Sequence, residues 1–439
     1  MSAPRRHGEH SVARRLVLAD LVAGGWARLA GCDLPQLMES AGLRVLAGET
    51  RTEGSETVVL LGDLRVQFTP ALAPPGAAAS DEANAYHRAL LAYAERGAVA
   101  KLGFTSLSPL RDNSLAVERL VYHRLVLRLA QYGATPHVML PVGTYRCADL
   151  GRTLAAWPRA DPVRRGLEAA IADLPVDEED VPYYDVDELN VLLLERGRGS
   201  SLEEWAGADV PRSPDEWRSV LWQLLYTLVC FRDVGLRHND LHPGNVWIDT
   251  DLTPQTFIYF VDPRTYYAVP LVRGTMARVY DFDQATAPES ELQGAPGAPR
   301  NTTVSAEFLR ESGGPSNDFD VFTLLSALWV EPEWLPDEMR AAVLRWFRGS
   351  SELLDTEIAP PGGDYGMIPV EQMLRDPLFD RWRYALPQFD PGFLPATGFP
   401  NVYMPPRLLR SPATVGAIEA ALEPGAAVER VAFPLPRVR

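Results

Sequence analysis

The sequence predicts an α+β fold in which strands concentrate before residue 200 and helices dominate after it. Short segments rich in Val and Leu, bounded by Gly, Pro or polar residues, are typical of strands and recur in the first half of the chain. In the second half, apolar residues recur at helical spacing over longer segments. The 439 residues are enough to form one large core or two lobes.

Composition and charge argue against several classes of function. The chain carries 42 Lys and Arg against 58 Asp and Glu, a formal net charge of −16, which argues against a nucleic-acid-binding surface. No apolar run approaches the length of a membrane span, and no signal-peptide core follows the N-terminus. The three cysteines, Cys32, Cys147 and Cys230, form neither a disulfide framework nor a zinc pattern. We therefore expect a cytoplasmic protein that binds no nucleic acid and no membrane.

The first part of the chain is expected to hold a helical extension, two strands and a further helix. Residues 11–40 carry apolar residues at helical spacing, so we assign residues 1–42 to an N-terminal helical extension. Residues 43–69 have the composition of two strands, and a linker rich in Pro, Ala and Gly follows them. Residues 83–96 are expected to form a helix that ends before Gly97.

A short strand and a long amphipathic helix come next. The strand is expected over residues 98–104, "AVAKLGF", and it contains Lys101, the only lysine in the chain. The helix is expected over residues 114–132, with Gly133 at its C-terminal stop. In a chain that otherwise uses arginine, the position of this lysine is informative, because an ammonium is a point charge that a planar guanidinium does not replace.

An acidic, helical insertion separates two further strands. We expect the insertion near residues 148–188, between strands at residues 137–146 and 189–197. A helix is expected to begin at residues 201–205. The segment 214–235 predicts a long helix that is nearly all apolar and should therefore be buried.

The loop after that buried helix concentrates polar side chains. Residues 236–248 contain His238, Asp240, His242 and Asn245 and lead into a strand. Such a loop on a rigid support is a common place for functional residues. A carboxylate can orient or deprotonate an attacking hydroxyl, and an amide oxygen five residues further on can bind Mg²⁺.

The segment "HNDLHPGN", residues 238–245, resembles the catalytic loop H-x-D-L-x-x-x-N of the protein-kinase-like fold. It is also similar to the H-N-D-L-H loop of Ser/Thr protein kinases of large DNA viruses. The resemblance implies a bilobal fold, with a small β-rich N-lobe at residues 43–199 and a mainly helical C-lobe with a C-terminal tail at residues 200–439. It implies ATP and Mg²⁺ as cofactors, Asp240 and His238 as catalytic residues, and, for a viral protein, a location in the host cell or virion.

The family needs a second metal-binding carboxylate after the loop, and two residues compete for that role. Asp281 follows an apolar strand and begins "DFD", which resembles the D-F-G element with Asp in place of Gly. The resemblance implies that Asn245 and Asp281 hold Mg²⁺. Asp262 lies closer to Asn245, but residues 262–265, "DPRT", stand between two aromatic strand runs and are typical of a hairpin turn. We therefore favour Asp281 and interpret the hairpin as an insertion.

The resemblance also implies a phosphate-binding pair and a hinge. The family pairs a strand lysine, which contacts the α- and β-phosphates, with a glutamate on the following helix. Lys101 and Glu118 match these positions. The segment "LNVLLLERG" resembles the strand and hinge that join the two lobes, which implies that backbone groups around Glu195 and Gly197 bind the adenine edge.

The segment after Asp281 resembles an activation segment. It is polar and rich in Gly, Pro and hydroxyl residues, and it closes with "SAE", which resembles the A-P-E element and ends at Glu307. Helices are expected to dominate the rest of the chain. Asp320 matches the family's buried helix aspartate, which anchors the catalytic loop, and Asp318 competes for this role. Glu307 and Asp320 would both be structural residues.

Departures from the family pattern leave three functions open. No G-x-G-x-x-G motif precedes Lys101, and Gly54 and Gly62 are the candidates for the phosphate-covering loop. His242 stands where Ser/Thr protein kinases carry a lysine, and "DLHPGN" and "DFD" are also similar to small-molecule kinases of the aminoglycoside/choline type. The leading hypothesis is a Ser/Thr protein kinase that acts on protein substrates. The alternatives are a kinase for small hydroxylated acceptors and a non-catalytic pseudokinase that serves as a binding module.

Overall fold

The computed structural model describes the central part of the chain with several gaps. The described residues are 57–62, 98–107, 114–147, 149–156, 158–159, 162–172, 184–250, 252, 254–287, 318–355, 365–385 and 402–411. The helices predicted at 11–40 and 83–96 lie outside these ranges, as do Gly54 and Glu307.

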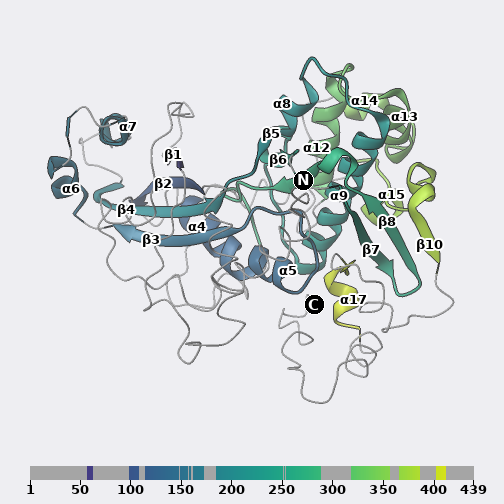
Figure 1. The fold of residues 1–439 in the computed structure, drawn as a ribbon, viewed down its shortest axis with the longest axis horizontal. Coiled ribbons are helices and arrows are strands. Elements are labelled where there is room, and N and C mark those ends of the chain that lie inside the picture. Colours follow the sequence, from purple (N-terminus) through teal and green to yellow (C-terminus); the bar gives the residue numbers. More distant parts are fainter. Residues whose placement is uncertain are drawn as a thin grey trace, which may run out of the picture.

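The first sheet is antiparallel and contains the predicted lysine strand. Its order is β1-β2-β4-β3 (Figure 1). Its strands are β1 (Thr57–Gly62), β2 (Ala98–Ser106), β3 (Pro141–Cys147) and β4 (Tyr184–Glu195). Lys101 lies in β2, opposite Val59 of β1 and Leu192 of β4, so its backbone is paired on both sides.

The strand β4 begins earlier than the sequence predicts. Tyr184 pairs with Ser106, so residues 184–188 belong to β4 and not to the insertion predicted at 148–188. Apart from buried Tyr184, these side chains are partly or fully exposed. Their acidic character is therefore compatible with a strand that runs past the edge of the core.

The strand β3 begins later than the sequence predicts. Val138 and Met139 do not join the first sheet. Val138 forms a parallel bridge with Val279, and the Met139 N–H donates to the Val279 carbonyl at 3.0 Å. The apolar segment predicted as one strand over 137–146 therefore divides its pairing between two sheets.

The helix after β2 carries Glu118 and contains one π-helical turn. The helices of this half are α4 (Ser114–Val121), η3 (Tyr122–Val126), α5 (Leu127–Gln131), α6 (Leu150–Ala156) and α7 (Pro162–Ala172). The first three are continuous, and η3 is the π-helical part, a feature often found near functional sites. Gly133 follows the helix with a φ of +69°, a left-handed conformation that glycine adopts without strain.

Two capped helices begin the second half. They are α8 (Leu202–Ala206) and α9 (Pro214–Val234). Ser201 and Glu204 form a capping box at the start of α8, and Ser213 and Glu216 form another at the start of α9. Every residue of α9 from Glu216 to Phe231 is buried, as the apolar sequence predicts.

A small three-stranded sheet supports the predicted catalytic loop and contains the strand that leads to Asp281. Its strands are β5 (Gly199–Ser201), β6 (Val246–Asp249) and β9 (Met276–Val279), in the order β5-β6-β9. Short 3₁₀ turns precede β6 and β9, namely η4 (Pro243–Asn245) and η5 (Val272–Gly274). β6 and β9 pair antiparallel, with Val246 opposite Val279. The start of β6, which follows the loop, therefore lies beside the end of β9, which leads to Asp281.

The predicted hairpin is present and belongs to a third sheet. Its strands are β7 (Thr256–Asp262), β8 (Thr265–Pro270), β10 (Arg383–Ala385) and β11 (Val402–Tyr403), in the order β10-β8-β7-β11. The sequence does not predict β10 and β11. Strands of three and two residues are too short for a periodic pattern, and they exist because the hairpin supplies partners.

The remaining elements are mostly helical, as predicted. They are α12 (Asp318–Val330), α13 (Asp337–Trp346), α14 (Ser351–Leu354), α15 (Val370–Met373), η6 (Pro377–Trp382) and α17 (Pro406–Leu409). None of the helices in the described ranges is both long and apolar enough to cross a bilayer.

The segment 402–411 joins elements that are distant in sequence. Val402 pairs with Ile258 in β7, and the Met404 N–H donates to the Gly133 carbonyl at 3.1 Å. The Arg407 guanidinium lies 3.1 Å from the Asp233 carboxylate at the end of α9. This segment therefore ties the hairpin to the ends of α5 and α9.

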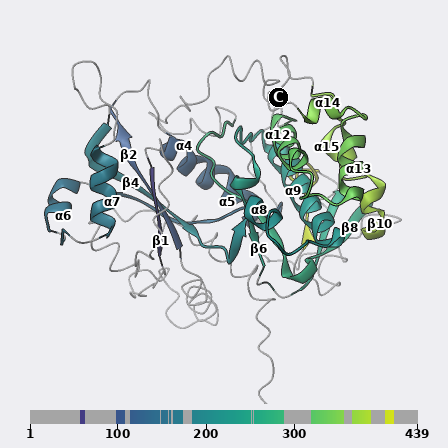
Figure 2. The ribbon, with the colours of Figure 1, turned by 90° about the horizontal axis from the view of Figure 1, so that it is seen from above.

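The first sheet lies at one end of the molecule and α9, α12 and α13 lie at the other, with α5 between them (Figures 1 and 2). Most buried apolar side chains form one connected cluster that runs from β2 and β4 through α9 to α12 and α13. A second, smaller cluster consists of Ile258, Phe260, Met404 and Leu408. The division of the chain at residues 199 and 200 stays a prediction.

Candidate active site

Lys101 lies among three carboxylates. Its Nζ is 2.9 Å from Oε2 of Glu118, 2.6 Å from Oδ1 of Asp281 and 3.6 Å from Oδ2 of Asp283. Lys101 is 7% exposed and Glu118 is fully buried. The strand β2, the helix α4 and the segment after β9 thus bring these four side chains together.

The charges of this cluster do not balance, because three carboxylates face one ammonium. Burial alone would lower the pKa of Lys101, but Glu118, Asp281 and Asp283 raise it well above its usual value. Burial raises the pKa of Glu118 to about 8 against the opposing effect of Lys101. Burial also raises the pKa of Asp283, whereas Lys101 lowers the pKa of Asp281 despite burial. The raised pKa values of Glu118 and Asp283 reflect both their burial and the crowding of carboxylates around one ammonium.

The ring of Phe282 fixes the direction of Asp281. Phe282 is fully buried, and its ring centroid lies 5.2 Å from that of Tyr122, 5.7 Å from that of Phe231 and 5.0 Å from that of His238. Asp281 adopts a left-handed backbone conformation with a φ of +67°, which is uncommon for a residue other than glycine. We infer that the packing of Phe282 holds this conformation, so that the Asp281 carboxylate is aimed at Lys101.

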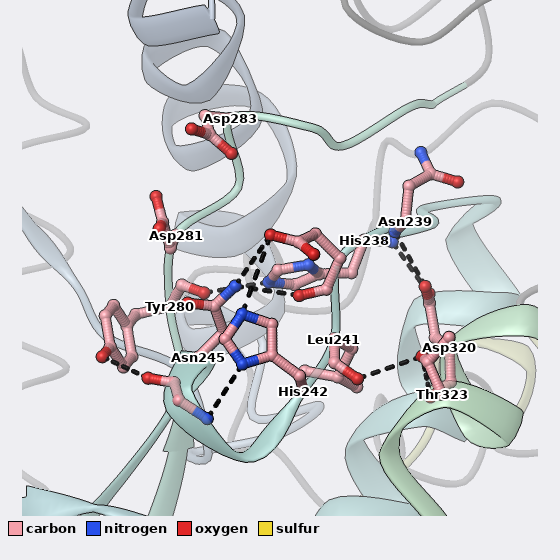
Figure 3. Close-up of polar contacts among 12 residues, drawn as sticks. His238, Asn239, Leu241, His242, Asn245, Tyr280, Asp281, Asp283, Asp320 and Thr323 are labelled. Carbon is pink, nitrogen blue, oxygen red and sulfur yellow. Dashed lines mark hydrogen bonds and ion pairs between the residues drawn. The ribbon is translucent and has the colours of Figure 1, made fainter. Parts of the chain in front are cut away.

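Asp320 anchors the backbone of the predicted catalytic loop. Its Oδ2 accepts from the His238 N–H and its Oδ1 accepts from the Asn239 N–H, each at 2.8 Å (Figure 3). Asp320 is fully buried in the first turn of α12. Asn239 has a φ of +66°, so the two bonds hold an unusual turn. Of Asp318 and Asp320, the two candidates in this helix, Asp320 is the residue that holds the loop backbone.

Asp240 and Asn245 face each other across the loop. The Asn245 Nδ2 donates to the Asp240 carbonyl at 2.8 Å and to Asp240 Oδ2 at 3.2 Å. His242 accepts from the Gly244 N–H through Nδ1 at 3.1 Å, and its Nε2 lies 3.8 Å from Asp240 Oδ2. The side chain of Asp240 is 49% exposed, although the side chains of its loop neighbours His238 and Asn245 are buried. The loop therefore presents one accessible carboxylate on a rigid backbone.

His238 and Tyr280 join the loop to the strand β9. His238 is fully buried, and its Nε2 lies 2.9 Å from the Tyr280 carbonyl oxygen. The Tyr280 hydroxyl donates to the Gly244 carbonyl at 2.5 Å, and its N–H donates to the Asn245 carbonyl at 3.1 Å. These bonds fix Asp240 and Asp281 relative to one another. His238 thus serves to position the loop.

Of the predicted hinge residues, Glu195 ends β4 and turns its side chain inward, and Gly197 follows two residues later. The Glu195 Oε1 accepts from the Leu140 N–H at 2.9 Å, and Glu195 is 1% exposed. A Cβ at Gly197 would lie 2.0 Å from Trp247 Nε1 and 2.8 Å from Asp249 Oδ1, so a larger residue there would require these side chains to move. Within the described ranges, the backbone groups of Arg196 and Gly197 make no hydrogen bond.

The competing candidates lie elsewhere. Asp262 ends β7, where its carboxylate accepts from the Arg264 N–H at 2.9 Å and from Arg375 at 3.2 Å. Gly62 ends β1 and pairs with Ala98. The prediction that it forms a phosphate-covering loop stays untested, because residues 63–97 lie outside the described ranges.

Sequence reasoning missed two features of this region. Asp283 lies in the lysine cluster, and the "DFD" triplet itself carries a signal for it, since a carboxylate replaces the family's glycine. Arg278 is fully buried within β9. A charged residue inside the apolar strand "MARV" is its only sequence signal, and that signal does not name a partner.

Comparisons with known proteins give little beyond this geometry. No protein-family model matches the chain, and no curated protein matches it. Among solved structures, the chain is similar to the crystal structure of the Rad53 kinase domain and SCD2, with 12% sequence identity and a TM-score of 0.29, over 64% of this chain and 79% of that chain. The likeness is low, and the function is therefore inferred from the contacts of the site.

Proposed function

We propose that this chain is an ATP- and Mg²⁺-dependent phosphotransferase with a bilobal protein-kinase-like fold, and that it acts on Ser/Thr hydroxyls of proteins. One observation carries the proposal. The single lysine lies within hydrogen-bonding distance of Glu118 and Asp281, and the strand that leads to Asp281 is bonded to the loop that presents Asp240. A phosphate-binding ammonium, a metal-binding carboxylate and an accessible base are the parts that phosphoryl transfer to a hydroxyl requires.

Asp240 is the residue that acts on the acceptor. Its half-exposed carboxylate accepts a hydrogen bond from the attacking hydroxyl and takes its proton. The new bond forms between the hydroxyl oxygen and the γ-phosphorus, the bond from that phosphorus to the β–γ bridging oxygen breaks, and ADP leaves. The anchoring of the loop by Asp320 keeps Asp240 in place for this step.

Lys101 neutralises phosphate charge. An ammonium already held by Glu118 needs little reorganisation when phosphate oxygens approach. Glu118 keeps the ammonium at the end of its flexible stem in one orientation. Backbone groups at Arg196 and Gly197, which are free within the described ranges, are suited to bind the adenine edge.

Asn245 and Asp281 carry the side-chain oxygens that would hold a magnesium ion. The Asn245 Nδ2 is engaged by Asp240, which leaves its Oδ1 as the amide atom available for a metal. Asp281 supplies a carboxylate, and Mg²⁺ typically takes one or two protein carboxylates with phosphates and waters as the other ligands. When bound, the ion would neutralise the charge of the nucleotide phosphates.

A kinase for small hydroxylated acceptors is the second candidate. It is favoured by His242, whose Nε2 lies 3.8 Å from Asp240 Oδ2, where Ser/Thr protein kinases carry a lysine. It is also favoured by Asp283, which adds a carboxylate to the lysine cluster. On this alternative, the nucleotide-binding residues keep their roles and only the acceptor differs.

The test is transfer of labelled γ-phosphate by the purified full chain with Mg²⁺. Label on the chain itself or on a generic protein supports a protein kinase, and label only on small hydroxylated acceptors supports the second candidate. Asp240→Asn should abolish transfer and retain ATP binding, whereas Asp262→Asn, a change at a half-buried carboxylate of the hairpin, should leave transfer intact. Transfer by Asp240→Asn at the unmodified rate would reject the assignment of the loop.

A further inference from the structure

Three charged side chains are buried together behind the hinge. Arg278 and Asp249 are 0% exposed and Glu195 is 1% exposed. One terminal nitrogen of Arg278 lies 3.2 Å from Glu195 Oε1, and the other contacts Asp249 Oδ2. We name Glu195, Asp249 and Arg278 the hinge triad. None of these side chains takes part in the chemistry proposed above.

The hinge triad links three separate elements. Glu195 ends β4, Asp249 ends β6, and Arg278 lies in β9. Each carboxylate also holds backbone of a neighbouring segment. Oε1 of Glu195 accepts from the Leu140 N–H at 2.9 Å, and Oδ1 of Asp249 accepts from the Arg198 N–H at 2.6 Å. Glu195 precedes Arg196 and Gly197, and Arg198 follows them. The triad therefore contacts the chain on both sides of these two residues.

Arg278 also lies on the strand that leads to the metal-binding carboxylate. It pairs with Trp247 of β6, and the next residue, Val279, exchanges hydrogen bonds at 3.0 Å with Met139 and His137. Asp281 follows β9 after a single residue, Tyr280. Because β9 is paired on both edges, Arg278 and Asp281 lie on one rigid segment. A change in the contact between Arg278 and Glu195 therefore changes the position of the hinge relative to Asp281.

Stability alone does not require charges here. A buried ion triad is costly to desolvate, and well-packed apolar side chains are often as stable or more stable in its place. What a guanidinium offers is geometry, since its planar fork can hold two carboxylates in fixed directions. Here one fork holds a hinge carboxylate and a β6 carboxylate at once.

We propose that Arg278 is a positioning residue for nucleotide selection. It fixes the spacing between the hinge backbone at Arg196 and Gly197 and the carboxylate of Asp281. Only a nucleotide whose base and phosphates match that spacing engages both ends. This inference rests on the proposed ATP-dependent function. It states that the hinge triad makes the site bind ATP more tightly than a phosphate chain that lacks a base.

The first test uses a neutral triad. The variant Arg278→Met/Glu195→Gln/Asp249→Asn removes the charges without leaving one unpaired, and thermal denaturation checks its fold. Binding of ATP and of tripolyphosphate, each with Mg²⁺, is measured by calorimetry. We expect ATP affinity to fall about tenfold or more, since small misplacements have large effects at such sites. Tripolyphosphate affinity should stay within about twofold of the unmodified chain, because this ligand has no base to contact the hinge.

A second variant covers the case in which the neutral triad fails to fold. Arg278→Lys retains the charge and loses the fork, and we expect it to weaken ATP binding while tripolyphosphate binding is unchanged. The matched control is Arg375→Met, which removes an arginine paired with Asp262 in the hairpin. It should change the affinity for neither ATP nor tripolyphosphate.

The outcomes separate this inference from the function on which it rests. Unchanged ATP affinity in a folded neutral triad or in Arg278→Lys would overturn the positioning role, and so would an equal loss of ATP and tripolyphosphate. An unmodified chain that binds neither ligand would instead reject the proposed nucleotide-dependent function, and this inference with it.

Discussion

Lys101 and Asp281 are 180 residues apart in sequence, and their side chains are joined by a hydrogen bond of 2.6 Å. This contact brings a strand of the first sheet to the segment that follows β9. It exists because Glu118 holds the lysine from one side and Phe282 packs so that Asp281 faces it from the other. The nucleotide phosphates of the proposed reaction would bind where these two charges meet.

Replacement of Lys101 by Arg should retain the fold and reduce phosphotransfer by about a hundredfold or more, because a planar guanidinium cannot take the place of a compact ammonium between Glu118 and phosphate. Steady-state transfer of labelled phosphate measures the loss, and circular dichroism checks the fold. Turnover at the unmodified rate would contradict the assignment.

The single lysine also permits a direct binding test. An amine-reactive reagent can modify only Lys101 and the N-terminal amine of this chain. ATP with Mg²⁺ should protect Lys101 and leave the N-terminal amine unprotected as an internal control. Mass spectrometry of the two peptides reads both. Equal modification of Lys101 with and without nucleotide would argue against a phosphate site.

Asp281→Asn and Asp262→Asn form a matched pair. Both remove one negative charge, but only Asp281 contacts Lys101, whereas Asp262 contacts Arg264 and Arg375. We expect Asp281→Asn to lower transfer by about a hundredfold or more and to shift the Mg²⁺ dependence to higher concentration. The hairpin variant should behave as the unmodified chain. A titration of activity against Mg²⁺ distinguishes the two.

Asp320→Ala should destabilise the chain by about 2–4 kcal/mol, because two backbone N–H groups of the loop lose a charged acceptor in a buried place. Denaturant unfolding measures this. Asp318→Ala, two residues earlier in the same helix, should cost less, since Asp320 is the acceptor of both of these loop N–H groups. Equal losses for the two variants would remove Asp320 from its role as anchor.

His123 should make stability depend on acid pH. Burial, with Arg119 and Arg124 nearby, lowers the pKa of His123 from 6.5 to about 4. The neutral ring therefore contributes stability above pH 6.5, and this contribution is lost as the pH falls toward 4, by at most about 1.4 kcal/mol per pH unit. His123→Gln should show a smaller loss over that window in denaturant unfolding. Parallel curves for the two chains would contradict the shift.

Gly197→Ala should disturb the hinge by steric conflict with Trp247. A Cβ there would lie 2.0 Å from Trp247 Nε1, and such overpacking typically costs about 1–3 kcal/mol. We expect lower stability and weaker ATP binding. The double variant Gly197→Ala/Trp247→Ala should recover part of the ATP affinity, which calorimetry measures. Without recovery, Trp247 is not the cause.

Elements with strong local patterns could be predicted from the sequence. The strand with Lys101, the buried helix α9 and the β7–β8 hairpin all follow from periodicity or turn chemistry. The choice of Asp281 over Asp262 rests on turn chemistry too, since a carboxylate in a hairpin turn is used by the turn itself. The role of Asp281 in metal binding stays a prediction.

Features that depend on partners could not be predicted. The strands β10 and β11 form only because β8 and β7 offer free edges. The early start of β4 reflects pairing with Ser106, against a local composition that is acidic. The partners of Arg278 are Glu195 and Asp249, at the ends of two other strands. No local sequence pattern around Arg278 predicts these partners.

The pairing of β11 with β7 has a consequence for synthesis on the ribosome. Val402 lies opposite Ile258. The edge strand β11 of the hairpin sheet is therefore translated much later than β7, its partner. Until residue 402 has emerged, the β7 edge offers unpaired N–H and C=O groups that invite pairing with another chain. Contacts of such long sequence separation form slowly, and nascent chains stalled before this segment are the species most exposed to aggregation.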